Sequence, residues 1–350
     1  MERQPALDLL RVIAIIGVIA IHVFGAIVGN PDVRGSATWW AAVAIDLGFV
    51  WVVPMFVLVS GALLLTSRAQ DSGPGHFYRK RLLRLGPAFV FWQVFYLWVV
   101  RAGMSGQELP LGTVVQLLAD GTPYTHLYFL WLIVGLYAVA PVIWPFLRDG
   151  DRRRGLALAG VLLLVTALAY TTAAVLTWGG VTRTLQLSAF TQWLPYVGYF
   201  VAGFALSGIV LRRSRALIAL AVAAIVLAGI VWEYGAAEPG TALRAILPVG
   251  YTSLPTMIAT VCLFLAVVGL AAAWRPKPAV RRALVTLSDA SFGVFLVHFV
   301  VLVGLRLLIP AFVPADRSLP IALLLWILVV VISFAIAIAA RRVPFVRRVF

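Results

Sequence analysis

The sequence predicts an all-α fold, a polytopic bundle of about ten transmembrane helices with both termini in the cytoplasm. Of its 350 residues, 63% are hydrophobic and only 12% are charged, whereas soluble domains are about half apolar and a quarter charged. The mean hydropathy is +1.02. The charges gather in short clusters between long apolar stretches, which is typical of a multi-pass membrane protein.

Ten apolar stretches are long enough to cross a bilayer, which takes about 20 residues. The segments on the side of the N-terminus carry 22 Lys and Arg residues, and those on the other side carry 6. Because basic segments stay in the cytoplasm, both termini are expected there. The predicted spans are 7–29, 39–66, 82–103, 125–147, 155–178, 190–211, 215–235, 250–273, 287–309 and 319–340.

Charge and cysteine content narrow the function classes. The net charge of +15 would suit nucleic acid, but the basic residues border the apolar spans, so no nucleic-acid partner is expected. The single cysteine, Cys262, permits no internal disulfide and no cysteine-based metal site.

The first span carries Arg11 and His22 and no small-residue cleavage site, so we expect it to be retained in the mature protein and not removed as a signal peptide. No glycine loop for phosphate, zinc signature or nucleophile elbow is present.

The span 7–29 is unusual because it contains Asp8, Arg11 and His22. Ionisable groups in a membrane cost roughly 2.5 kcal/mol or more unless they find partners or water. At about 100° per residue, His22 lies within roughly 20° of Arg11 and about 16 Å further along the helix. It would stand about 22 Å from the cytoplasmic start of the helix. His22 is therefore a candidate for chemistry, with a polar strut between helices as the alternative.

Two more polar residues fall inside predicted spans. Asp46 lies in the outer third of span 39–66, and structural and functional roles are equally open for it. His298 lies deep in span 287–309, at a depth close to that of His22. Both are candidates to join His22 in one site.

Arg81 and Arg84 stand one helical turn apart at the cytoplasmic mouth of span 82–103. A basic cluster beside a membrane is usually a topology signal or a phospholipid anchor. Arg84 follows two leucines and precedes a long apolar run, which places it deeper than an anchor requires. Two guanidinium groups there would suit a phosphate-bearing ligand from the cytosol.

Five motifs stand in order along the chain. They are LDLLRVIAIIGVIAIH with Arg11 and His22, PMFVLVSGALLL with Ser60-Gly61, FYRKRLLRLGP with Arg81 and Arg84, THLYFLWLIVGLYAVAP, and LSDASFGVFLVH ending at His298. Together they resemble the motifs of the acyltransferase-3 family of integral membrane acyltransferases. Tyr128 stands where many members of that family have tryptophan. Its bacterial members O-acylate surface polysaccharides and some small molecules.

The resemblance implies a membrane O-acyltransferase in the bacterial inner membrane, with residues 1–350 as one domain in a stand-alone form without a periplasmic domain. The donor would be cytosolic acetyl-CoA or another acyl-CoA, with no metal, and the acceptor a hydroxyl of a surface polysaccharide, glycolipid or related small molecule. The expected catalytic residues are His22, Asp46 and His298. Those expected to bind the donor are Arg11, Arg81, Arg84 and Ser60.

Within this interpretation His22 would be a general base or would carry the acyl group itself, and we favour the base. A transporter or flippase of a lipid-linked sugar is the main alternative, and a non-catalytic scaffold is a third. Transporters tend to place charges near the bilayer midplane, on broken and repeated helices. Here the arginines gather at one mouth while the histidines lie deeper, which favours the acyltransferase. The sequence predicts no particular oligomeric state.

Overall fold

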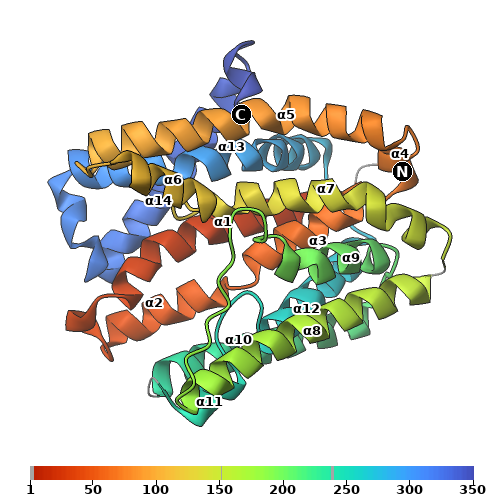
Figure 1. Cartoon of the computed structure of the whole chain (residues 1–350), viewed down its shortest axis with the longest axis horizontal. Coiled ribbons are helices and arrows are strands. Elements are labelled where there is room, and N and C mark those ends of the chain that lie inside the picture. Colours follow the sequence, from red (N-terminus) through yellow and green to blue (C-terminus); the bar gives the residue numbers. More distant parts are fainter. Residues whose placement is uncertain (1–3, 151, 238–239) are drawn as a thin grey trace. The chain divides into compact units, whose positions relative to one another are not determined.

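The computed structural model describes residues 4–150, 152–237 and 240–350 (Figure 1). These residues form helices and turns and no β-strand, which confirms the all-α class. The α-helices are α1 (Pro5–Val28), α2 (Ala37–Gly48), α3 (Val52–Leu64), α4 (Ser67–Gln70), α5 (Pro74–Phe95), α6 (Leu111–Ala119), α7 (Tyr128–Arg148), α8 (Arg152–Trp178), α9 (Val197–Leu206), α10 (Arg213–Ala236), α11 (Ala242–Ile246), α12 (Leu254–Ala271), α13 (Pro278–Leu308) and α14 (Leu319–Ala340).

Within the described ranges, nine helical stretches are long and apolar enough to cross a membrane. This number counts α2 with α3 as one stretch, and α5 with its π-helical continuation η2 (Tyr96–Met104) as another. The nine stretches match nine of the ten predicted spans, so the chain is a multi-pass membrane protein.

The prediction of span 190–211 was wrong in its length, because only Leu194–Leu206 is helical there. The backbone N–H of Ser188 donates to the Thr191 hydroxyl at 2.8 Å, which closes a turn before the helix. Pro195 follows, and it stands at the start of the helical segment, where its missing N–H costs nothing. The apolar composition of residues 190–211 therefore predicted a longer helix than the one that forms, because local polar contacts close a turn before it.

The predicted span 39–66 is interrupted by a turn at Phe49–Trp51, between α2 and α3. Pro54 has no N–H to donate to the carbonyl of Val50, and its ring crowds that carbonyl. The predicted single span is therefore two helices, with the break just before the proline.

Two helices begin earlier than their predicted spans 82–103 and 287–309. Helix α5 begins at Pro74 and α13 begins at Pro278. In both helices the proline stands at the start, where its fixed φ suits the helix and its missing N–H costs nothing. Arg81 and Arg84 therefore both lie on α5.

The chain forms two compact units. The first unit comprises the described residues up to Phe56, with those of Leu164–Thr184 and Ser207–Ala339. The second unit comprises the described residues of Val57–Leu163, Leu185–Leu206 and Ala340–Phe350. The second unit therefore contains most of α3, α4 to α7, the first part of α8, α9 and the C-terminal segment.

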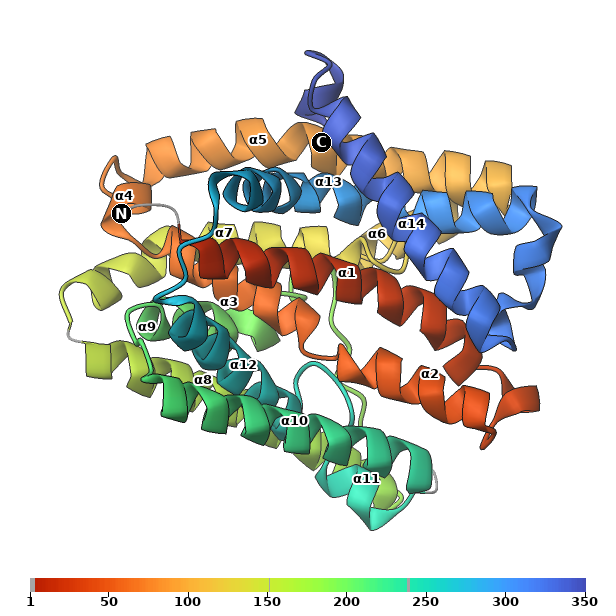
Figure 2. The same ribbon diagram turned by 180° about the vertical axis from the view of Figure 1, so that it is seen from behind.

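Helix α1 is the centre of the first unit. It packs against α2, α12 and α13, while α10 lies along α12 and also packs on α2 (Figures 1 and 2). Several α1 side chains have no exposed surface, as expected of a helix that is surrounded by others. These are Ala14, Ile15, Ile19, Ala20, Phe24 and Ile27.

Two tryptophan indole N–H groups on neighbouring helices donate hydrogen bonds to backbone carbonyls of α1. Trp39 Nε1 of α2 donates to the Val28 carbonyl at 3.0 Å, which satisfies a carbonyl left over at the C-terminus of α1. Trp326 Nε1 of α14 donates to the Ile16 carbonyl at 3.2 Å in the middle of the helix. These bonds fix where α2 and α14 meet the central helix.

In the second unit, α5 and α7 run antiparallel. Residue numbers rise along α5 as those of their contacts around α7 fall. The Tyr78 hydroxyl also donates to the Ala138 carbonyl at 2.8 Å. The ring contacts are Arg81 over Tyr137 at 5.6 Å, Phe89 with Trp131 at 4.7 Å, and Tyr96 with His126 at 4.7 Å.

Candidate active site

Asp8 joins α1 to α13 inside the first unit. Its side chain is 4% exposed, and the Ser288 hydroxyl donates to its Oδ1 at 2.6 Å. Arg11 follows on the next turn of α1 and is half-buried. The charged end of the first span is therefore held by a specific contact with α13. The sequence singled out the two segments separately but not this contact.

The same two helices bring His22 and His298 together. Their rings stack with centroids 5.4 Å apart and planes inclined by 22°. Phe299 lies against the His22 ring, with centroids 4.4 Å apart. His298 has no exposed surface, while His22 is half-buried. Of the two imidazoles, His22 is the one with surface left to meet a substrate.

The hydrogen bonds of His298 assign its tautomer. Its Nδ1 lies 2.7 Å from the Phe295 carbonyl oxygen and 3.3 Å from that of Val294. A carbonyl only accepts hydrogen bonds, so Nδ1 carries the proton and Nε2 carries the lone pair. The backbone of α13 thus fixes the orientation of this ring and, through stacking, supports the ring of His22.

Asp46 approaches α1 from α2. A Cβ added to Gly25 would lie 3.9 Å from Asp46 Oδ2, so the carboxylate lies beside this glycine. Gly25 is one helical turn beyond His22, and residues three apart share a helix face. The first unit therefore holds the three expected catalytic residues on α1, α2 and α13, with Asp46 one turn along α1 from the stacked rings.

Arg81 belongs to the second unit, where two aromatic rings hold its guanidinium group. It lies 5.3 Å from the Phe77 ring centroid and 5.6 Å from that of Tyr137. Its Nε is buried and has no hydrogen-bond partner among the residues that the structure describes. Arg84, one turn further along α5, is exposed. The pair can present guanidinium donors to an anion, with Arg81 held in place.

Ser60 is half-buried on α3, and the glycine after it has a packing role. A Cβ on Gly61 would overlap the Phe200 carbonyl, and one on Gly203 would overlap the Leu58 carbonyl. Helices α3 and α9 therefore cross with their backbones in contact, which only glycine permits. The Ser-Gly motif of the second span thus serves helix packing through its glycine.

The sequence did not indicate Gln93 of α5. It is 4% exposed, and neither its amide nitrogen nor its amide oxygen has a hydrogen-bond partner within the described ranges. Trp131 Nε1, on α7, is also buried without an acceptor there. The only signal was a glutamine within an aromatic stretch, which suggested packing alone.

Chemically, the first unit offers a fixed, proton-accepting imidazole pair, and the second offers an arginine held between rings. In the parts of the chain that are described, no group of three or more His, Cys, Asp or Glu residues is arranged to hold a metal ion. Proton transfer and anion binding are the chemistry that these groups support.

Comparison with known proteins gives one match. A family model described as "Acyltransferase domain" matches residues 4–342. No curated protein and no solved structure matches the chain. The matched range takes in parts of both compact units and every candidate residue described above.

Proposed function

The chain belongs to the acyltransferase-3 family, and from that premise we propose that it transfers a short acyl group from an acyl-CoA to an acceptor hydroxyl. It is an acyltransferase and a multi-pass membrane protein. The proposed donor is acetyl-CoA, and the proposed acceptor is a surface polysaccharide, a glycolipid or a related small molecule. Residues 1–350 would act as a single acyltransferase domain in a bacterial inner membrane.

The observation that supports this proposal best is the stacking of His22 on His298 at 5.4 Å, within membrane-spanning helices. A buried imidazole is costly unless it is used or well partnered. His298 is held by backbone carbonyls, whereas His22 keeps exposed surface. His22 is therefore the proposed base and His298 its positioning residue.

In the proposed step, a ring nitrogen of His22 takes the proton of the acceptor hydroxyl as its oxygen attacks the thioester carbonyl carbon. The new C–O bond forms, the C–S bond breaks, and the CoA thiolate leaves. The imidazolium then returns its proton to the thiolate, so that CoA leaves as the thiol and His22 is neutral again. Asp46 would support the positive charge that His22 carries between these two transfers.

The donor's phosphates would bind Arg81 and Arg84. Arg81 is the better placed of the two, because its guanidinium is fixed by Phe77 and Tyr137 and its Nε lacks a partner among the described residues. A guanidinium that is already ordered loses less entropy when it binds a phosphate. Arg11 and Ser60 remain proposed donor contacts on the resemblance alone.

The alternative, in which His22 carries the acyl group, gives a different experimental result. The purified protein is mixed with radiolabelled acetyl-CoA without an acceptor and is then denatured. A stoichiometric label that is absent from His22→Gln would identify an acyl carrier. With a base, protein stays unlabelled and transfer occurs only when a hydroxyl acceptor is present.

The test of the whole proposal is radiolabelled acetyl transfer from acetyl-CoA by the purified protein to a panel of surface glycans. Family membership favours this activity over the rival transporter of a lipid-linked sugar. Folded protein that neither transfers acetyl groups nor hydrolyses the thioester, but moves lipid-linked sugar across vesicles, would overturn the proposal.

A further inference from the structure

The segment that follows α14, residues 341–350, is rich in arginine, and we call it the basic segment. It contains four arginines and no acidic residue, and residues 318–340 before it contain no acidic residue either. All four arginine side chains are exposed. Its positive charge therefore faces outward without a carboxylate close by in the sequence. The arginines are Arg341, Arg342, Arg347 and Arg348.

Exposed apolar side chains stand between the two pairs of arginines. Phe345 is 80% exposed and Val343 is 47% exposed. The guanidinium of Arg348 lies over the Phe345 ring, 6.0 Å from its centroid. An open aromatic ring among basic residues is typical of a segment in the membrane interface, where apolar side chains enter the acyl region and arginines stay at the headgroups. The basic segment therefore has the composition of an interfacial anchor.

The basic segment is attached to α5 within the second unit. Trp92 Nε1 donates to the Val349 carbonyl at 2.7 Å, and the ring centroids of Trp92 and Phe350 lie 5.5 Å apart. Trp92 itself is 3% exposed. Because a hydrogen bond and a ring contact to a buried tryptophan hold the segment against α5, its arginines do not extend freely into water.

The part of α5 that bears Trp92 belongs to the membrane-spanning stretch Pro74–Met104. Its neighbours Val90, Phe91 and Val94 are exposed, so the hydrocarbon of the bilayer reaches this part of the helix. In Figures 1 and 2 the basic segment, in dark blue, lies above α5, and α7 lies below α5. The basic segment therefore lies on the lipid-facing side of α5 and not inside the bundle.

Anionic phospholipid headgroups complement the basic segment. A guanidinium presents its N–H donors in a planar fork that matches a phosphate group. Anionic lipids of the cytoplasmic leaflet attract basic residues beside a membrane span, and the 22 to 6 distribution of basic residues predicts that the segment lies on that side. A topology signal requires the arginines alone, and it requires neither an exposed Phe345 nor an attachment to Trp92.

We propose that the basic segment binds anionic phospholipids of the leaflet that it faces. Its arginines contact the phosphate groups, Phe345 enters the acyl region, and Trp92 holds the segment beside α5. The binding involves no transfer of an acyl group. The proposal rests on exposed side chains and on the contact with α5, and it stands whether or not the chain uses acetyl-CoA.

The test uses the full-length protein in detergent and native mass spectrometry with two lipids of identical acyl chains. Phosphatidylglycerol is anionic, and phosphatidylcholine has no net charge. We expect the wild-type protein to bind its first phosphatidylglycerol at least about tenfold more tightly than its first phosphatidylcholine. Equal affinities would overturn the proposal. Displacement of phosphatidylglycerol by CoA would also overturn it, because the lipid and the proposed donor would then share one site.

Two matched double variants locate the site. Arg347→Gln with Arg348→Gln removes two charges from the basic segment, and Arg281→Gln with Arg282→Gln removes two exposed charges near the start of α13. Glutamine keeps N–H donors and loses the charge. The first variant should lose at least about tenfold in affinity for phosphatidylglycerol, and the second less than about twofold. Equal losses would mean that net charge alone matters, and they would reject the site.

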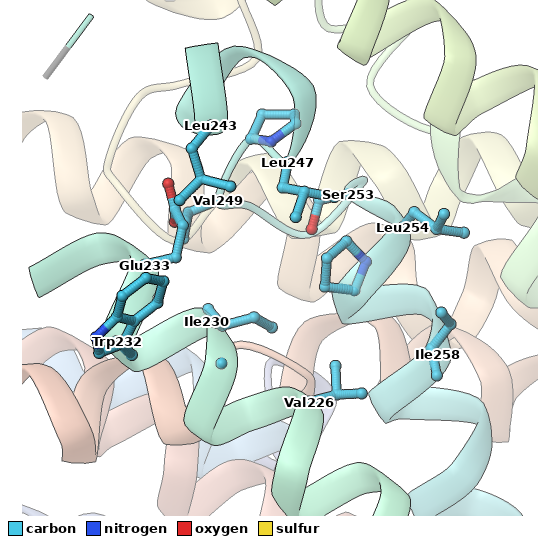
Figure 3. A pocket seen from close by; sticks show the side chains of 13 residues that line it. Val226, Ile230, Trp232, Glu233, Leu243, Leu247, Val249, Ser253, Leu254 and Ile258 are labelled. Carbon is cyan, nitrogen blue, oxygen red and sulfur yellow. The ribbon is translucent and has the colours of Figure 1, made fainter. Parts of the chain in front are cut away.

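A pocket in the first unit is a second place where a lipid chain fits, and Figure 3 shows apolar side chains such as Ile230 and Ile258 around it. Its volume is about 370 Å³, and none of its described lining residues is Arg or Lys, so it does not favour an anionic headgroup. Gly229 lines the pocket, and a Cβ there meets nothing within 4 Å, so Gly229→Leu fills part of it. This variant should keep the full preference for phosphatidylglycerol. Loss of the preference would place the lipid in the pocket and reject the proposal.

A fluorescent probe reports whether the basic segment enters the membrane. In a Cys262→Ser background, Val343→Cys is labelled with a polarity-sensitive fluorophore and reconstituted into vesicles of phosphatidylglycerol or of phosphatidylcholine. Its emission should shift to shorter wavelength in phosphatidylglycerol, and the shift should shrink in about 1 M salt, which screens charges beyond about 3 Å. Ser72→Cys, in the exposed turn before α5, should show no such shift. Identical emission of the probe at position 343 in the two lipids would contradict the proposal.

Discussion

The imidazole rings of His22 and His298 stack with centroids 5.4 Å apart, although the two residues lie on the first helix and on α13. Backbone carbonyls of α13 fix His298, and Phe299 lies against the His22 ring at 4.4 Å. The His298 ring is thus held by hydrogen bonds to its own helix, and by stacking it orients the ring of His22. The His22 side chain keeps some exposed surface. This asymmetry separates the proposed base from its positioning residue.

For the base, we expect His22→Gln to insert and fold normally and to lose at least ~100-fold in acyl transfer. Glutamine keeps hydrogen bonding but cannot take a proton near neutral pH. The loss corresponds to the low end of what general-base catalysis supplies. Radiolabelled acetyl transfer measures the rate, and elution as a single gel-filtration peak measures folding.

His298→Gln is the comparison for that experiment. It removes the ring that stacks on His22 while keeping an amide donor, so a smaller loss in transfer is expected, together with a lower melting temperature from the lost stacking. A near-normal rate for His22→Gln would transfer the assignment to His298 or Asp46.

Donor binding should depend on how Arg81 is held. We expect Arg81→Ala and Arg84→Ala to weaken CoA binding by about tenfold or more, because a charged hydrogen bond to phosphate contributes about 1.5 kcal/mol. Tyr137→Leu removes one of the two rings beside Arg81. It should weaken CoA binding by a smaller factor, through loss of order in the guanidinium. Isothermal titration with CoA measures all three.

Tyr78→Phe provides the control for Tyr137→Leu. It removes the hydrogen bond from Tyr78 to the Ala138 carbonyl, at the same α5–α7 contact, without removing a ring from Arg81. CoA affinity should stay at the wild-type value. If the arginine variants bind CoA normally and insert poorly, the basic pair is a topology signal only.

Helix packing at the Ser60-Gly61 motif gives a stability prediction. Gly61→Ala places a methyl group against the Phe200 carbonyl, and we expect a loss of about 1–3 kcal/mol in the free energy of unfolding. Gly160→Ala, where a Cβ meets nothing within 4 Å, should leave stability unchanged or slightly higher. Tryptophan fluorescence during heating measures both. Equal melting temperatures would contradict the close crossing of α3 and α9.

Hydropathy predicted most of the helices because crossing a bilayer demands a long apolar stretch whatever its neighbours are. It did not predict where helices end, since Pro54, Pro74 and Pro278 set those points by backbone chemistry. The length of the sixth span was overstated for a different reason. The turn at Ser188 is closed by a hydrogen bond to the Thr191 hydroxyl, and a mean hydropathy does not register such a contact.

The candidate residues His22, Asp46 and His298 could be predicted from the sequence, because an ionisable side chain inside a membrane span costs free energy and is therefore unusual. Their arrangement did not follow, because no periodicity within one helix reports contacts with another. The Asp8–Ser288 bond at 2.6 Å is of this kind. Gln93 was missed because a lone glutamine among aromatic residues gives no pattern, and only its burial without partners among the described residues marks it.

The orientation prediction can be tested at six exposed positions, in a Cys262→Ser background. Arg34, Arg183 and Arg317 are predicted to lie outside, and Ser72, Arg152 and Lys277 inside, because basic residues number 22 on one side and 6 on the other. Each is replaced by cysteine in turn, and intact cells are treated with a membrane-impermeant maleimide.

The first three cysteines should be labelled in intact cells, and the second three only after the cells are opened. All six side chains are exposed in the folded protein, so a cysteine that fails to react is shielded by the membrane and not by packing. The reverse pattern would place Arg81 and Arg84 away from the cytosol. Since acyl-CoA is cytosolic, that result would remove the donor role of both arginines and require another site for its phosphates.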